Sequence, residues 1–262
     1  MCFLTSEQLL RSSIHISVQS TDGSTVHATA FFFKFKCGNE ETNVLVSNRH
    51  VLDNSISFNF FLNVSPLSYS WEECCQSYST KNFTYKNPYI ITHPDPTVDL
   101  ALFLMDATLN LLKKSDLQLA HWIIDESLIP TSEEWLHLSA MEELLMVGCP
   151  RGIFDICNNL PLMRKVITAS HPAYDFNRKP IFISDIACFP GSSGSPIFSY
   201  DTSPCIVEDS EALFINPLRS KLLGIQSEVF MFEKNCYMNL AIAVKSSELL
   251  AFRPLLADIQ KE

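Results

Sequence analysis

The sequence predicts an all-β protein, because strand patterns recur along its length whereas helix patterns are short and few. The chain has 262 residues, of which 47% are hydrophobic and 18% charged, so it can bury a large core. A connecting region from about residue 106 to 139 separates two groups of predicted strands. Residues 1–262 are therefore expected to form a single domain with two β subdomains.

The first subdomain is expected to cover residues from about 13 to 108. Its clearest strands are an aromatic-rich segment at 30–36, a β-branched segment at 44–47 and an apolar run at 100–105. The second subdomain is expected from about residue 140 to 245. Its six predicted strands lie at 144–148, 165–169, 180–184, 195–198, 222–227 and 240–244.

Short helices are predicted between and beside these strands. Amphipathic patterns occur at 109–117 and 133–138 in the connecting region, and the first eleven residues show another, with Ser6 as its cap. A C-terminal helix is expected over about 246–253 and should be interrupted by Pro254. The segment 199–219 is too long for a tight hairpin, so it is predicted to be a surface loop.

A glycine-serine turn at 189–196 carries the first chemical signal. The chain has only seven glycines, and two of them, Gly191 and Gly194, lie on either side of Ser193. Glycine permits tight backbone angles and a close approach of a ligand to the main chain. The turn can therefore present both the hydroxyl and the amide of Ser193, as a nucleophile requires, although a plain turn would have the same composition.

A serine nucleophile needs a base, and the base needs a carboxylate to orient it. His50 follows the predicted strand at 44–47, and Asp99 opens the apolar strand that follows it. A carboxylate beside apolar residues needs a buried partner to offset its desolvation, and a histidine ring would supply one. Taken singly, His50 also fits a structural residue at a strand end, and Asp99 fits an ordinary start of a strand.

The order of the three residues strengthens the interpretation. About fifty residues separate His50 from Asp99 and about ninety separate Asp99 from Ser193, as expected when one β-barrel carries the first two and a second carries the serine. In this respect the sequence resembles the trypsin-like serine peptidases of the chymotrypsin fold, particularly the bacterial and intracellular branch related to the HtrA proteases. That family is the general model of the Ser-His-Asp mechanism.

Five segments carry the resemblance. They are the histidine motif at 47–51, the aspartate motif at 99–102, the nucleophile motif at 191–196, the strand at 222–227 and the glycine-proline turn at 146–152. The resemblance implies two six-stranded antiparallel barrels and a short C-terminal helix. It also places the predicted loop at 199–219 near the active site.

The resemblance also implies a role for each matched residue. Ser193 would be the nucleophile, His50 the general acid and base, and Asp99 its orienting carboxylate. The amides of Gly191 and Ser193 would form the oxyanion hole. The strand through Ser227, Glu228 and Val229 would line the substrate cleft and pair with an extended peptide.

Two positions depart from the family pattern. Ser192 stands where secreted digestive members carry an aspartate that pairs with a new N-terminus, so that activation switch is not expected here. Residues 28–31 read Ala-Thr-Ala-Phe where relatives often have Gly-Thr-Gly-Phe, and we expect this change to alter packing near the cleft.

The specificity pocket is expected to be uncharged. With no insertion before the nucleophile, the pocket floor falls on Ala187, which offers no charge for a lysine or arginine side chain. A small or medium apolar side chain would then be preferred, although Glu228 could still add charge. Cleavage confined to sites after basic residues would contradict this expectation.

The formal net charge of −10 disfavours nucleic acid as a partner, because its phosphates would be repelled.

The nine cysteines are odd in number and form no disulfide framework, which favours free thiols in a reducing compartment. No spacing of cysteine and histidine indicates zinc, and neither a metal nor a cofactor is predicted.

The cytoplasm is the predicted location. The first residues lack the basic and apolar regions of a secretory signal, and no stretch reaches the roughly twenty apolar residues that a membrane span needs. A peptidase there must be restrained. Narrow specificity or an oxyanion hole organised by an activating partner would provide the restraint.

Two functions remain open at this point. In the first, the chain hydrolyses peptide bonds of a protein substrate through an acyl-enzyme on Ser193, in limited or regulatory proteolysis. In the second, it keeps the fold and binds an extended peptide without cutting it. The loss of a triad residue would favour the second function, and none is lost.

Overall fold

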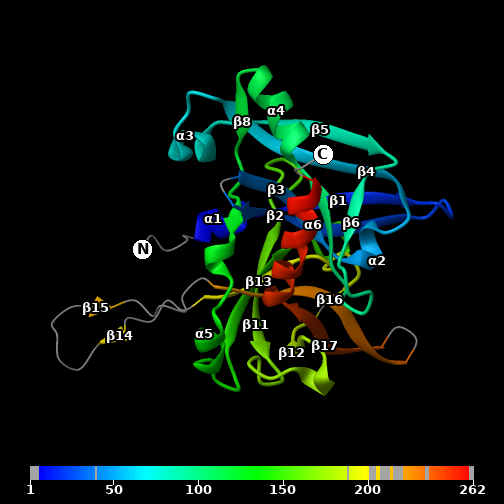
Figure 1. Cartoon of the computed structure of the whole chain (residues 1–262), viewed down its shortest axis with the longest axis vertical. Coiled ribbons are helices and arrows are strands. Elements are labelled where there is room, and N and C mark those ends of the chain that lie inside the picture. The colour runs from blue at the N-terminus through cyan, green and yellow to red at the C-terminus, as the bar shows by residue number, and fades with distance from the viewer. Residues whose placement is uncertain are drawn as a thin grey trace.

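The structure is a computed structural model, and it describes residues 6–259 except 39, 188, 201–204, 207–212, 215–220 and 234–235. Figure 1 shows two β units stacked one above the other, with the C-terminal helical segment lying across both. This arrangement confirms the predicted all-β fold class with a short C-terminal helix. The second unit is a closed six-stranded barrel, whereas the first is a curled sheet.

The first unit is a nine-stranded antiparallel sheet with one parallel pair. Its strands are β1 (Ser13–Ser20), β2 (Thr25–Cys37), β3 (Glu40–Ser47), β4 (Ser55–Pro66), β5 (Ser79–Lys86), β6 (Ile90–Thr92), β7 (Ala101–Leu104), β8 (Leu117–Leu119) and β9 (Ile124–Asp125). The strand order is β5-β4-β1-β2-β3-β7-β6, with β8 paired to β4 and β9 paired to β2.

The expectation of a six-stranded first barrel therefore needs correction, because nine strands take part and the described pairings do not close. Strands β8 and β9, which lie off the main path of the sheet, account for two of the three extra strands. In the first part of β4, buried Phe58, Phe60 and Leu62 alternate with half-buried Asn59 and exposed Phe61. A period of two is the mark of a half-buried strand.

Strand β2 joins the two units because it is buried on both faces. Phe32 packs into the core of the first sheet, whereas Phe31, Phe33 and Phe35 pack on the opposite face. That second face shares a cluster with Val147 and Phe198 of the barrel and with Phe252 of the C-terminal segment. The run of phenylalanines thus forms the interface between the units rather than one side of a single core.

The second unit confirms the six strands predicted for it. The barrel closes in the order β10-β11-β12-β17-β16-β13. Its strands are β10 (Glu143–Gly148), β11 (Leu162–Thr168), β12 (Ile181–Asp185), β13 (Pro196–Ser199), β16 (Leu222–Glu233) and β17 (Cys236–Lys245). Two short strands, β14 (Cys205–Ile206) and β15 (Leu213–Phe214), pair with each other between β13 and β16. Most of the predicted loop at 199–219 lies outside the described residues.

The helices are short, as predicted. They are α1 (Ser6–Leu10), α2 (Arg49–Leu52), α3 (Trp71–Gln76), α4 (Asp106–Lys114), α5 (Ser132–Leu136) and α6 (Arg253–Ile259), with 3-10 turns η1 (Glu126–Leu128), η2 (Pro150–Gly152), η3 (Phe176–Arg178) and η4 (Ser246–Phe252). None of the described helices has the length and apolar character needed to cross a bilayer.

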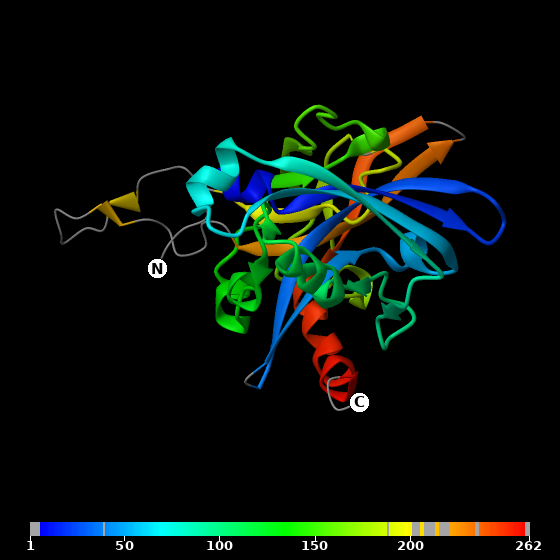
Figure 2. The same ribbon diagram turned by 90° about the horizontal axis from the view of Figure 1, so that it is seen from above.

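Pro254 does not end the C-terminal helix, so this expectation was wrong. The 3-10 turn η4 continues directly into α6, and Pro254 lies in the first turn of α6. Proline is tolerated there because the N–H that it lacks would have no partner within the helix. Figure 2 shows this helical segment extending away from the sheets, on a different side from the β1–β2 hairpin.

Candidate active site

His50 and Asp99 meet in the cleft between the two units. His50 lies in the short helix α2 that follows β3, and Asp99 lies just before β7, which pairs with β3. The Nδ1 atom of His50 is 2.7 Å from Oδ2 of Asp99, and the backbone N–H of His50 donates to Oδ1 at 2.9 Å. Asn48 also donates from its side chain to the carbonyl oxygen of Asp99 at 2.9 Å. The carboxylate therefore fixes the ring and keeps a proton on Nδ1.

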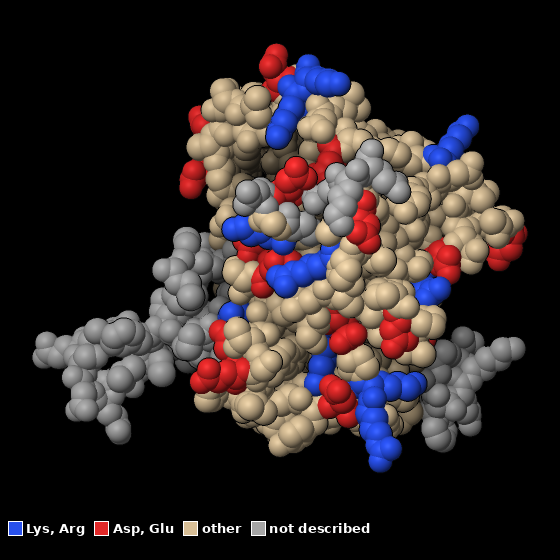
Figure 3. All heavy atoms as spheres, in the orientation of Figure 1, with Lys and Arg blue, Asp and Glu red and all other residues tan. Residues whose placement is uncertain are grey.

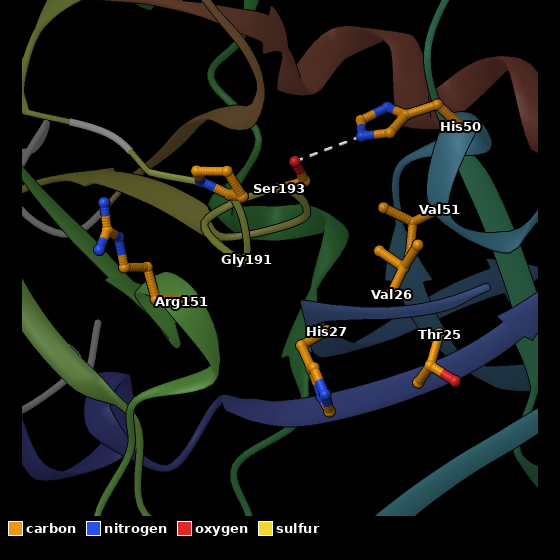
Figure 4. Close-up of a pocket in the computed structure, with 9 residues that line it drawn as sticks. Thr25, Val26, His27, His50, Val51, Arg151, Gly191 and Ser193 are labelled. Carbon is orange, nitrogen blue, oxygen red and sulfur yellow. Dashed lines mark hydrogen bonds between the residues drawn. The ribbon is translucent and has the colours of Figure 1, made fainter. Parts of the chain in front are cut away.

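Ser193 faces the other nitrogen of the same ring. Its Oγ atom lies 3.3 Å from Nε2 of His50, the contact drawn as a dashed line in Figure 4. The carbonyl oxygen of Ser227 lies 3.1 Å from the same Oγ atom and is an alternative acceptor for its one proton. With the proton on Nδ1, Nε2 is left with a lone pair that can accept the serine proton. The structure thus brings His50, Asp99 and Ser193 into one line of hydrogen bonds.

Ser227 is a further partner of the carboxylate. Sequence reasoning placed it only in the substrate cleft, but its hydroxyl donates to Oδ2 of Asp99 at 2.5 Å. Asp99 therefore accepts hydrogen bonds from the ring and the amide of His50 and from Ser227. A carboxylate with this many donors is held ionised and in one orientation.

The pKa values of the pair shift in opposite directions. Burial alone would lower the pKa of His50, but the hydrogen bond and charge of Asp99, with a contribution from Glu228, outweigh it and raise the pKa above its ordinary value. Burial alone would raise the pKa of Asp99, but its bonds to His50 and Ser227 and the His50 charge lower it. Asp99 is thus a stable anion that makes His50 a stronger base.

The loop before β13 presents two amides beside Ser193. Gly191 has φ of 97°, and a Cβ atom there would lie 2.7 Å from the backbone nitrogen of Arg151. The N–H of Arg151 donates to the carbonyl oxygen of Pro190 at 2.6 Å. In a trans peptide the N–H points opposite to the carbonyl, so the N–H of Gly191 points away from Arg151.

Neither of these amides has an acceptor in the described part of the chain. Among the described residues, no hydrogen bond is made by the N–H of Gly191 or of Ser193, whereas the N–H groups of Ser192, Gly194 and Ser195 all donate to backbone oxygens. Two unpaired N–H groups two residues apart in one loop are donors that an oxyanion could accept from.

Thr29 of β2 holds this loop from the first unit. Its N–H donates to the carbonyl oxygen of Ser193 at 2.9 Å, and its Oγ1 donates to the carbonyl oxygen of Gly191 at 3.1 Å. The same Oγ1 accepts from the N–H of Cys149 at 2.9 Å. Ala28 and Ala30 point to the other face of β2, where their methyl groups are buried in the core of the first sheet. The alanines thus add packing on the far side of β2 from the loop.

A cavity of about 220 Å³ opens beside Ser193 on the side of strand β16. Ser227, Glu228 and Val229 line it as predicted, together with Ser192 and Gln226. Ala187 is not among the lining residues, and its carbonyl oxygen accepts a hydrogen bond from the Arg164 guanidinium at 2.6 Å. The anchoring of this segment by Arg164 could not be read from the sequence spacing that pointed to Ala187.

Sequence reasoning did not single out Gln226 as a pocket residue. Its side chain is buried, and Nε2 donates to the carbonyl oxygens of Glu228 and Ile242 at 3.1 and 3.3 Å. These two acceptors fix which end of the amide carries the nitrogen, and they leave Oε1 buried without a partner. Ser192, Ser227 and Glu228 also line the cavity, so its lining is more polar than a floor at Ala187 implied.

One edge of β16 is open beside this cavity. Strand β13 pairs with β16 only as far as Ile225. From Ser227 onward, no described strand pairs with that edge. An extended peptide can add to such an edge through main-chain hydrogen bonds.

Comparison with known proteins supports the fold and no more specific relationship. No protein-family model matches the sequence, and no curated protein matches it. Among solved structures, the chain is similar to HL collagenase, with 13% sequence identity, a TM-score of 0.54 and coverage of 99% of this chain and 97% of that one. It is similar to the protease Anisep of Arthrobacter nicotinovorans, with 12% identity, a TM-score of 0.53 and coverage of 94% and 95%.

A third similar structure is a serine endoprotease of Yersinia pestis, with 11% identity, a TM-score of 0.53 and coverage of 97% of this chain and 68% of that one. Identities this low establish a common fold. The chain therefore has a fold of the chymotrypsin type, the fold of trypsin-like serine proteases.

Proposed function

We propose that this chain is a serine endopeptidase that cuts protein substrates through an acyl-enzyme on Ser193. The observation that carries the proposal is the line of contacts from Asp99 through both nitrogens of His50 to the Ser193 hydroxyl. The unpaired amides of Gly191 and Ser193 next to that hydroxyl supply the second requirement of acyl transfer.

The reaction would begin when the Ser193 hydroxyl gives its proton to Nε2 of His50 and its oxygen bonds to the substrate carbonyl carbon. The carbonyl oxygen becomes an anion and accepts hydrogen bonds from the two loop amides. The bond from carbon to the leaving nitrogen then breaks, and His50 returns the proton to that nitrogen. A water molecule repeats the sequence on the ester, which frees Ser193 and a carboxylic acid.

The substrate would bind as an extended strand. Its segment before the scissile bond would pair with the open edge of β16 at Ser227, Glu228 and Val229, and one side chain would enter the cavity beside Gln226. Ala187 is no longer proposed as a direct contact of that side chain, because it does not line the cavity. A preference for an apolar over a basic side chain in this cavity stays a prediction, and among the described lining residues the Glu228 carboxylate is the one group that opposes it.

Fluorophosphonate labelling tests the proposal. A fluorophosphonate reacts with a serine only when a neighbouring base activates it. We expect the purified chain to be labelled at Ser193, and we expect His50→Ala to lose the label. Peptide mapping with Ser193→Ala as the control would locate the site. A folded wild-type protein that takes no label would instead support the second function, a module that binds a peptide without cutting it.

The pH dependence of the activity gives a separate prediction. His50 must be neutral to accept a proton, and its pKa is raised above 6.5, so kcat/KM should fall as the pH drops through that raised value. Glu228→Gln removes one of the charges that raise this pKa, and the acidic limb should then move to lower pH. A pH-rate profile would measure the shift.

The control for Glu228→Gln is Glu72→Gln, which removes the same charge from an exposed position on α3. The profile of this variant should match that of the wild type. An acidic limb that moves equally in both variants would mean that total charge, rather than Glu228 beside His50, sets the pKa.

We also propose where the protein acts and how its activity is restrained. Cys74, Cys75, Cys149 and Cys157 are free thiols in the described part of the chain, in keeping with a reducing compartment such as the cytoplasm. For restraint we now favour narrow substrate specificity over an oxyanion hole that awaits a partner, because the two amides are already unpaired without one.

A further inference from the structure

A second cavity adjoins Ser193 on the side away from β16. It has a volume of about 450 Å³, and its lining includes Val26, His27, Val51, Arg151 and Gly191. Figure 4 shows Arg151 on the opposite side of Ser193 and Gly191 from His50. Under the proposed function, the segment before the scissile bond occupies the β16 side. The leaving-group segment would therefore pass through this second cavity.

The residues that line this cavity carry a net positive charge, whereas the chain as a whole is negatively charged. The whole sequence carries a formal charge of −10, yet no acidic residue is among those lining the cavity. Arg151 is the lining residue with a permanent charge. The side chains on the face shown in Figure 3 instead mix both signs. An anionic substrate group would therefore bind more favourably in this cavity than on the β16 side, where the Glu228 carboxylate would repel it.

The Arg151 guanidinium has no carboxylate partner within the described residues. None of the ion pairs found there includes Arg151. Its guanidinium carbon lies 4.8 Å from the centre of the Phe189 ring, a contact that positions the cation without using its N–H donors. These donors suit a carboxylate, which a guanidinium can bind through two parallel hydrogen bonds.

The backbone of Arg151 is fixed next to the loop at 189–194 that carries the unpaired amides of Gly191 and Ser193, here called the oxyanion loop. Its φ and ψ are 54° and 24°, in the left-handed region that glycine or asparagine occupies at lower cost. Its N–H is bonded to Pro190, and the N–H of Gly152 is bonded to the carbonyl oxygen of Cys149 at 2.9 Å. A strained non-glycine residue that the surrounding contacts hold in place is a recurrent feature of functional sites.

Two histidines support the turn that carries Arg151. A Cβ atom on Gly152 would lie 3.4 Å from Cβ of His27 and 3.5 Å from Nε2 of His15, so both histidines lie beside the turn. The two histidines are joined by a contact of 3.1 Å, and Phe154 stacks on His15 with ring centres 4.8 Å apart. His15, His27 and Phe154 thus pack on one side of the turn, and this packing restricts the position of the Arg151 backbone.

We infer that Arg151 makes this cavity a subsite for a carboxylate on the leaving-group side of the scissile bond. The carboxylate would come from an Asp or Glu side chain in the first residues after the bond, or from the free end of a substrate chain. This inference rests on the proposed peptidase function for the direction in which the substrate lies. It predicts a preference for substrates with a carboxylate after the scissile bond, which the fold alone does not predict.

Cleavage of a mixed peptide library tests the inference. Products of the wild type, Arg151→Gln and Arg151→Lys would be identified by mass spectrometry. We expect Asp and Glu to be enriched about tenfold over Gln in the first positions after the cut, as one charge-assisted hydrogen bond allows. The enrichment should vanish in Arg151→Gln and persist in part in Arg151→Lys. A library with amidated ends would separate side-chain carboxylates from chain ends.

The matched control is Lys179→Gln, which removes a positive charge on the Asp99 side of the cleft, outside this cavity. Its preference for acidic residues should equal that of the wild type. Equal cutting before Glu and Gln by the wild type would overturn the inference while leaving the peptidase function intact. So would an acidic preference that Arg151→Gln retains.

A binding measurement keeps the inference testable if no peptide is cut. Phenylglyoxal modifies exposed arginines, and acetyl-Glu-Ala-amide should protect Arg151 in the Ser193→Ala variant. Acetyl-Gln-Ala-amide should give no protection. Equal protection by the two peptides, or none by either, would argue against a carboxylate subsite. Failure of fluorophosphonate labelling would count only against the peptidase function.

Discussion

Asp99→Asn should lower kcat/KM by about 10⁴-fold, the size of effect found when an amide replaces the carboxylate of such a triad. Asp99 now accepts the Nδ1 proton of His50 at 2.7 Å. An asparagine would present its NH₂ group to that nitrogen, which would then act as the acceptor. The ring proton would move to Nε2, and no lone pair would face Ser193.

The expected loss is one of chemistry and not of folding, so two measurements are needed. Steady-state kinetics would show the fall in kcat/KM, and thermal unfolding should show a Tm close to that of the wild type, because asparagine has nearly the same shape. A useful control is Asp106→Asn on α4. Asp106 likewise accepts a backbone N–H, from Asn43 at 3.2 Å, but its partner is Asn43 rather than His50. Full turnover in Asp99→Asn would remove Asp99 from the mechanism.

The sequence was sufficient to predict the fold class and to name the three residues that meet in the cleft. Their meeting could be predicted because the pattern depends on order along the chain and on residue types that few other chemistries require. The second barrel could be predicted because its strands are apolar runs bounded by turns. These features are local, and each can be read within a few residues.

Features that depend on contacts across the fold could not be read in the same way. The first sheet gained strands such as β4, whose polar residues alternate with phenylalanines and obscure the apolar pattern. Ala187 was expected to face the substrate, but its carbonyl is bonded to Arg164 of β11, a contact that spans 23 residues of sequence. Gln226 and Arg151 line their cavities because the closed barrel places them there, and no local sequence pattern shows this placement.

The two halves of the site differ in what holds them. His50 and Asp99 belong to adjacent elements of the first sheet, whereas Ser193 belongs to a loop of the barrel. Thr29 connects the halves, since it bonds to the carbonyl oxygens of both Ser193 and Gly191 from β2. The geometry of the oxyanion loop therefore depends on the packing between the two units as well as on its own glycines.

Gly191→Ala should lower kcat by roughly 10²- to 10³-fold, the effect of losing one oxyanion donor. The added Cβ atom would lie 2.7 Å from the nitrogen of Arg151 and 2.9 Å from both the oxygen of Cys149 and the nitrogen of Gly152. All three are backbone atoms of the neighbouring turn, so the loop itself must move. Its φ of 97° is also unfavourable for alanine, which would rotate the peptide and turn its N–H away from the substrate.

Gly23→Ala separates these two effects, because it shares the strain and lacks the collision. Gly23 has φ of 84°, and nothing lies within 4 Å of the position its Cβ would take. We expect this variant to lose some stability, seen as a lower Tm, and to keep its kcat. Titration of active sites with a fluorophosphonate would correct both variants for inactive protein. If Gly191→Ala turned over as fast as Gly23→Ala, the amide of Gly191 would play no part in stabilising the oxyanion, and the amide of Ser193 would have to act without it.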